Sequence, residues 1–108
     1  DPTQHAEVAV IRKAVKKIKH RHLIDCVLYT TQEPCPMCST AMIWARLETV
    51  VSGARMNDMK KYHSEKANKE WTWRTLHIPA CKIFAKGEPK VKMIEDFMRG
   101  ECIKLFHS

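Results

Sequence analysis

Long apolar runs are missing from this chain of 108 residues. None approaches the roughly 20 consecutive apolar residues that a transmembrane helix needs, so we expect no membrane span. The first residues, DPTQHAE, are acidic and polar, and they lack the pattern of a signal peptide. Repeats, low-complexity segments and linkers are also absent. A chain of this length forms at most one domain, here 1–108, with a modest core.

Acidic residues are scarce relative to basic ones. Twelve Asp and Glu stand against 19 Lys and Arg, which gives a formal net charge of +7. This excess permits an anionic partner such as RNA but does not establish one, because much of it lies on one face of an expected first helix. Apolar residues recur there at helical spacing, at Ile11, Ala14, Val15 and Ile18. The basic residues fall mainly on the other side, and the simpler interpretation is a solvated face: Arg12, Lys13, Lys16, Lys17 and Lys19.

The five cysteines are odd in number and irregular in spacing. This argues against a disulfide framework and favours a reducing cytoplasm. Cys26, Cys81 and Cys102 lie in apolar segments, so we expect them to be buried thiols. The apolar fraction of 44% and the charged fraction of 29% are typical of a soluble globular protein.

The remaining patterns predict alternating helices and strands. We expect strands over 25–31, 49–54 and 80–85, because these segments are apolar or β-branched. Helices are expected over 36–46, from Asn57 or Asp58 to 70, and from about 89 onward. The final helix would turn four apolar residues inward: Val91, Ile94, Met98 and Leu105. The alternation predicts an α/β sandwich with at least partly parallel strands.

The segment TQEPCPMCST places Cys35 and Cys38 three residues apart, at the start of a helix that follows a strand. Such a pair suits a redox centre, half of a structural zinc site, or part of a catalytic one. His5 supplies a third ligand at the start of the first helix. The spare candidates show no ligand-pair spacing: His20, His22, Cys26 and Cys81. One His and two Cys are the ligand count of a catalytic zinc site with an open fourth position.

Glu7 stands two positions after His5, where a carboxylate can take a proton from water and pass it on. His5-Ala6-Glu7 followed by Pro34-Cys35-Pro36-Met37-Cys38 matches the pattern of zinc-dependent base deaminases. Each half alone is common, but the joint pattern, with each half opening a helix, is specific.

With these motifs the chain resembles the cytidine and deoxycytidylate deaminase superfamily, in the branch of guanine deaminases and tRNA adenosine deaminases. The likeness rests on DPTQHAEVAVIRKA, LYTTQEPCPMCSTAMIWAR and VVSGAR, and it weakens beyond Arg55. It implies a three-layer α/β/α cytidine deaminase-like sandwich and a hydrolase that removes an exocyclic amino group as ammonia. It also implies Zn2+ on His5, Cys35 and Cys38, Glu7 as the catalytic proton carrier, and contact of the Ala6 backbone with the base edge.

The substrate stays open in this resemblance. Guanine, cytosine, a nucleoside and a tRNA anticodon base all fit. Members of the superfamily commonly form homodimers or larger homo-oligomers. Val8, Val10 and Trp44 are candidates for such an interface, because they can lie off the apolar stripes of their helices. The alternative function is a non-catalytic, zinc-stabilised module that binds nucleic acid or protein, which a fourth protein ligand would support.

One departure from the family concerns the start of the chain. Family members usually carry a helix and a β-hairpin before the His-x-Glu motif, whereas here only four residues precede His5. We therefore expect an N-terminally truncated version of the domain, with the strand 25–31 unpaired along one edge.

Several other conspicuous residues have simpler interpretations. We expect Met37, Met42 and Trp44 to pack in the core, and Trp71, Trp73 and Arg74 to form a hydrophobic corner and not a base-stacking platform. The remaining histidines are expected at the surface: His20, His22, His63, His77 and His107.

Overall fold

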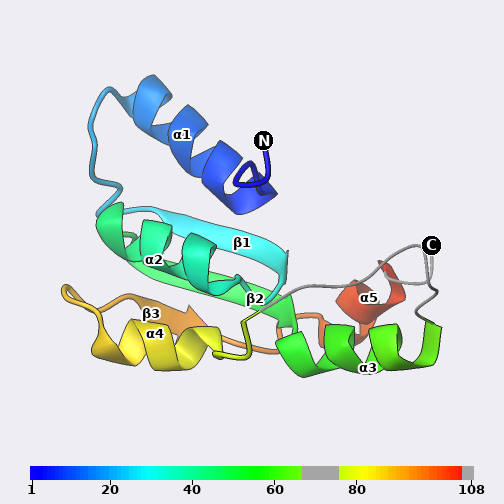
Figure 1. Cartoon of the computed structure of the whole chain (residues 1–108). Helices are drawn as coiled ribbons and strands as arrows, with labels where there is room; N and C mark the ends of the chain where they lie inside the picture. The colour runs from blue at the N-terminus through cyan, green and yellow to red at the C-terminus, as the bar shows by residue number, and fades with distance from the viewer. Residues whose placement is uncertain (67–75, 106–108) are drawn as a thin grey trace.

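A computed structural model describes residues 1–66 and 76–105 of the chain. The described helices and strands alternate along the sequence, except that two helices, α3 and α4, stand between β2 and β3 (Figure 1). In chain order they are α1 (Ala6–Ile18), β1 (Val27–Gln32), α2 (Pro36–Trp44), β2 (Thr49–Ala54), α3 (Met56–Lys66), α4 (Ala80–Lys86), β3 (Lys92–Ile94) and α5 (Arg99–Lys104). None of the described helices has the length and apolar character that crossing a membrane requires.

The three strands form a parallel sheet in the order β1-β2-β3. Val27 lies opposite Thr49 in the first pair, and Thr49 lies opposite Lys92 in the second. The central strand β2 is buried along its whole length, as its near-continuous apolar sequence TVVSGA predicts. In the described part of the chain, β1 pairs only with β2. The prediction of an unpaired edge along this strand is therefore confirmed.

The main core lies between one face of the sheet and the helices α1, α2 and α4 (Figure 1). Leu28 and Val50 point into it from neighbouring strands, and Met42 and Phe84 meet them from α2 and α4. Helix α5 covers the opposite face, where Gly53 of β2 lies against Cys102. Because side chains alternate along a strand, Val50 and Gly53 face different layers. The predicted three-layer α/β/α sandwich is confirmed.

Two predicted elements in the second half are wrong. Residues 80–85 form helix α4 and not a strand, because Ala80 and Phe84 lie one helical turn apart and are both buried, while Cys81 and Lys82 are exposed. The expected helix from 89 is interrupted: Lys92–Ile94 pairs with β2 as β3, and only Arg99–Lys104 is helical. Strand pairing within the fold overrides the local helical pattern here.

Several predictions of burial also need correction. Val91 is buried, but Ile94, Met98 and Leu105 are exposed and do not form an inward stripe. Met98 has a positive φ of 51°, which takes the backbone out of the right-handed helix before α5 begins.

The first two helices follow their predicted stripes in part. Ile11, Ala14 and Val15 pack against the core, whereas Ile18 at the end of α1 is exposed. Met42 is fully buried as expected. The predicted burial of two other residues on α2 is wrong, because Met37 and Trp44 are exposed.

The predictions for the burial of the cysteines and for the exposure of the interface candidates are also correct only in part. Cys81 is exposed, so its predicted burial is wrong, and Cys26 and Cys102 are only half-buried. Val10 is exposed as predicted, whereas Val8 packs against the core. Trp71, Trp73 and Arg74, the side chain of His63, and His107 lie outside the described residues. Of the other histidines, His20 and His77 are exposed and His22 is half-buried.

Candidate metal centre

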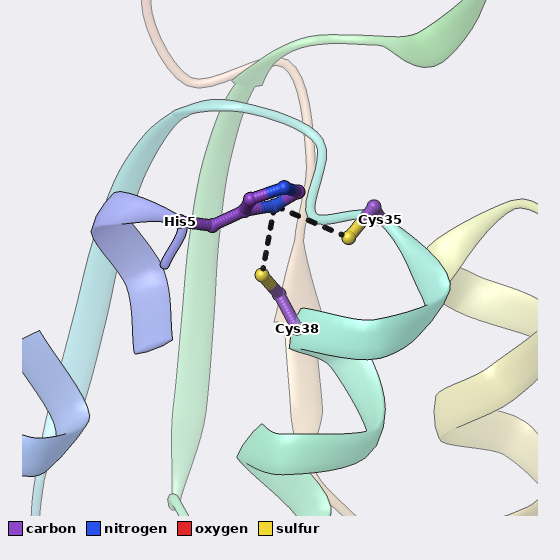
Figure 2. A group of neighbouring side chains, drawn as sticks. All are labelled: His5, Cys35 and Cys38. Carbon is purple, nitrogen blue, oxygen red and sulfur yellow. Dashed lines mark hydrogen bonds between the residues drawn. The ribbon is translucent and has the colours of Figure 1, made fainter. Parts of the chain in front are cut away.

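Two helix N-termini meet beside the carboxyl end of β1 (Figure 2). His5 is the N-cap residue of α1, and its backbone oxygen accepts a hydrogen bond from the amide of Ala9. Cys35 is the N-cap residue of α2, with Pro36 in the first helical position, where a missing N–H costs nothing. Cys38 follows in the first turn. The turn after the strand therefore brings both thiols toward the imidazole.

The structure brings His5, Cys35 and Cys38 together as one group, called here the His–Cys cluster. The His5 Nδ1 atom lies 3.5 Å from the Cys35 Sγ atom and 3.5 Å from the Cys38 Sγ atom (Figure 2). Tetrahedral zinc with ordinary Zn–N and Zn–S bonds holds a nitrogen and a sulfur ligand about 3.6 Å apart. The two observed separations match that value, so the donor atoms stand at the spacing that a zinc ion needs.

The three residues of the His–Cys cluster differ in how far they are buried. Cys38 is fully buried, Cys35 is half-buried and His5 is exposed. Burial raises the pKa of the Cys38 thiol, and the neighbouring Glu7 carboxylate and Cys35 raise it further. A buried thiolate next to a carboxylate is unfavourable unless a cation compensates it. The residues present therefore fit a thiophilic divalent cation.

Other potential ligands do not join the cluster. Among the described residues, this is the one group of three or more His, Cys, Asp or Glu side chains whose donor atoms lie within 4.8 Å of one another. The spare candidates His20, His22, Cys26 and Cys81 are not part of it. Three protein ligands leave a fourth position of a tetrahedral ion for water or substrate, which is the arrangement of catalytic zinc.

Glu7 and Ala6 occupy the first turn of α1, directly after His5. Glu7 is half-buried and lies close enough to Cys38 to affect the pKa of its thiol through a hydrogen bond and through charge. Ala6 is exposed at the first helical position. A carboxylate therefore stands beside the His–Cys cluster without being one of its three members.

Sequence reasoning missed Glu33, which directly precedes Pro34 and Cys35. Its two carboxylate oxygens accept hydrogen bonds from the amides of Met56 and Ala80, at 3.0 and 2.9 Å. An acidic residue before the Pro-Cys motif was visible in the sequence. Its partners were not, because they lie 23 and 47 positions away along the chain.

Charged pairs surround the same edge of the sheet. Arg55, just after β2, donates two hydrogen bonds of 2.7 Å to the Asp96 carboxylate, just after β3. Arg99 donates to both oxygens of Asp58 at 2.8 and 2.9 Å. The hydrogen bond from Arg99 lowers the pKa of Asp58, and the hydrogen bond from Arg55 lowers that of Asp96. These pairs connect α3, β3 and α5 at the carboxyl ends of the strands.

Comparison with known proteins identifies the family. The sequence matches the family model of MafB19-like deaminases over residues 1–99. The chain belongs to this deaminase family. The chain is 53% identical to the guanine deaminase of Bacillus subtilis strain 168 over 58 residues, which are 54% of this chain and 37% of that protein. It is 42% identical to the tRNA-specific adenosine deaminase of Buchnera aphidicola subsp. Baizongia pistaciae over 111 residues, covering 100% of this chain and 59% of that protein.

Solved structures agree on the fold of this chain. The guanine deaminase from Nitrosomonas europaea superposes with a TM-score of 0.71 at 23% identity, over 97% of this chain and 56% of that one. A structure from a study of A-to-I editing by tRNA:A34 deaminases gives a TM-score of 0.64 at 25% identity, over 97% of this chain and 67% of that one. The chain thus spans 37% and 59% of the two curated relatives named above, which is less than two thirds of either. The predicted resemblance to the guanine and tRNA adenosine deaminase branch is confirmed.

Proposed function

We propose that this chain carries the zinc centre of a hydrolytic deaminase that removes the exocyclic amino group of a nucleobase or nucleoside. The observation that carries the proposal is the His–Cys cluster at zinc-ligand spacing, with the Glu7 carboxylate beside it. Membership of a deaminase family supports the same reaction class.

His5, Cys35 and Cys38 would hold Zn2+, which supplies Lewis-acid activation of water when it is bound. Glu7 takes a proton from the attacking water and delivers it to the ring nitrogen next to the amino-bearing carbon. It then assists the loss of the amino group, so that water and the amine are converted into a carbonyl and ammonia. The Ala6 backbone, exposed at the start of α1, contacts the edge of the base.

The substrate is guanine, cytosine or cytidine, or an adenosine, either free or in tRNA. The relatives named guanine deaminase and tRNA-specific adenosine deaminase support the purine types. The exposed basic residues of α1 suit an RNA backbone, because they lie on the helix that begins at His5: Arg12, Lys13, Lys16 and Lys17. A structural zinc module, the alternative function, is less well supported, because the described residues offer no fourth ligand in the cluster.

We further propose that the protein acts in the cytoplasm as a homodimer or larger homo-oligomer. Val10 on α1 and Trp44 on α2 support an interface near these two helices, since both are apolar and exposed, Trp44 to 76%. Symmetric pairing about a twofold axis is the default arrangement for such a surface.

The test combines metal analysis with an ammonia assay. The purified chain is expected to contain about one zinc ion per chain, as the one set of three candidate ligands among the described residues implies. Guanine, cytidine, adenosine and tRNA are then supplied in turn, with C38S as the control that lacks one ligand. Absence of bound zinc after purification without chelator would remove the basis of the mechanism. Ammonia release that is equal in wild type and C38S would also contradict it.

A further inference from the structure

Glu33 joins residues 34–38, which carry the two thiols and are called here the metal-binding turn, to three other parts of the fold. It lies between the end of β1 and the Pro34-Cys35 pair. Its backbone amide donates a 2.7 Å hydrogen bond to the oxygen of Ala54, which continues the pairing of β1 with β2 by one residue. The position of the backbone immediately before the metal-binding turn is thereby fixed against the central strand.

The Glu33 side chain holds the starts of two helices. One oxygen accepts from the amide of Met56, the first residue of α3, and the other accepts from the amide of Ala80, the first residue of α4. These amides have no partner within their own helices, and a negative charge at a helix N-terminus is favourable. One carboxylate therefore accepts hydrogen bonds from the first amides of two helices that are far apart in sequence.

The residues that follow Glu33 in the sequence connect it to the proposed ligands. Pro34 is fully buried, and its oxygen accepts a 3.2 Å hydrogen bond from the Ser39 hydroxyl of α2. Cys35 follows at once, with its Sγ atom 3.5 Å from the His5 imidazole. Only one residue, the fully buried Pro34, separates Glu33 from the proposed ligand Cys35. A shift of Glu33 would therefore move Cys35 relative to His5 and Cys38.

We propose that Glu33 is a positioning residue of the metal centre, which sets the place of Cys35 by clamping the starts of α3 and α4. This rests on the proposed function, because it takes the His–Cys cluster to be a metal site. Glu33 is not a member of the His–Cys cluster. It acts through Pro34 and Cys35, as residues behind metal ligands commonly do.

The test uses E33Q with D58N as a matched control. Gln keeps the size of Glu33 but offers an NH2 group where one of the two amides needs an acceptor. Asp58 is also a carboxylate at the start of α3, where it accepts a 2.8 Å hydrogen bond from the Arg55 amide. Unlike Glu33, it is not joined to the metal-binding turn. Both changes remove one charge at the same helix start, but only E33Q disturbs the path to Cys35.

Cobalt titration with a competing chelator gives the metal affinity, and the visible absorption of the thiolate–cobalt complex reports the ligand geometry. We expect E33Q to bind cobalt about 10-fold to 100-fold more weakly, as loss of a group behind a ligand commonly does, with a shifted spectrum. D58N should keep the wild-type affinity and spectrum even though it lowers the melting temperature. E33D, which keeps the charge but is one methylene shorter, should fall between wild type and E33Q, and it replaces E33Q if that variant does not fold.

Wild-type affinity and an unchanged spectrum in E33Q or E33D would overturn the inference. An equal loss of affinity in D58N would also overturn it, because the effect would then reflect general stability. A wild-type chain that binds no cobalt would be a different failure, since it would remove the metal centre itself and the proposed function with it.

Discussion

Replacing Gly53 by alanine tests the packing of α5 on the sheet. A Cβ atom at this position would lie 2.2 Å from the Cys102 Sγ atom, 2.9 Å from the Cys102 Cβ atom and 3.0 Å from the Phe97 backbone oxygen. Non-bonded carbon atoms are most stable about 3.5–4.0 Å apart. The sulfur can rotate away, but the Cβ atom and the backbone oxygen cannot. Helix α5 would therefore have to move away from β2, and overpacking of this kind costs about 1–3 kcal/mol.

The assay is thermal unfolding followed by circular dichroism. For a domain of this size, each 1 kcal/mol lowers the melting temperature by about 4–8 °C. G100A is the control, because a Cβ atom at Gly100 in α5 meets no atom within 4 Å and alanine favours a helix by about 0.5–1 kcal/mol. G100A should thus be neutral or stabilising. The double variant G53A/C102A should recover only part of the loss. A melting temperature of G53A equal to that of wild type would refute the contact between α5 and β2.

The remaining predictions concern the metal, catalysis, pH and assembly. Removing zinc with a chelator should lower the melting temperature in calorimetry, since metal at 1,000 times its Kd stabilises a fold by about 4.1 kcal/mol; an unchanged melting temperature would argue against a zinc site. E7Q should retain zinc yet lose turnover by about 10²–10⁴-fold in an ammonia assay, as loss of a general base does, and loss of metal instead would mean that Glu7 is a ligand. Arg99 lowers the folded-state pKa of Asp58, so the stability that this pair contributes is present above the ordinary Asp pKa of 3.8 and is lost as the pH falls below it. Urea denaturation should accordingly show a smaller acid-side loss in D58N than in wild type, and equal losses would contradict the ion pair. Light scattering at micromolar concentration should give at least a dimer for wild type and a smaller assembly for W44E, whereas a monomeric wild type would exclude the interface.

The His–Cys cluster could be predicted from the sequence because its signals are local. Cys35 and Cys38 are spaced within one helical turn, and each ligand motif stands at a helix start that the neighbouring residues mark. Only the meeting of His5 with the two thiols needed long-range information, and the joint His-x-Glu and Pro-Cys-x-x-Cys pattern supplied it. Their roles as zinc ligands stay predictions until the metal is measured.

The helices and strands from residue 80 onward could not be predicted correctly from the apolar pattern of the sequence. These last three elements are short: α4 has seven residues, β3 has three and α5 has six. Such segments owe their conformation to pairing with β2 and to packing on α2, and not to their own apolar pattern. Glu33 shows the same limit within the site, because a carboxylate that caps two distant helices leaves no periodic signal.

The chemistry of this chain is concentrated where the parallel strands end. The proposed metal-binding turn follows β1, Arg55 follows β2, and Asp96 follows β3. In parallel α/β sheets, ligands bind outside the carboxyl ends of the strands, where helix N-termini converge. The starts of α1 and α2 converge on His5, and the starts of α3 and α4 converge on Glu33. Four helix starts at one edge would leave many amides without partners, and the carboxylate of Glu33 satisfies two of them. The hydrogen bonds of Glu33 and the proposed metal site thus both follow from one topology. A change at Glu33 should therefore alter the metal affinity.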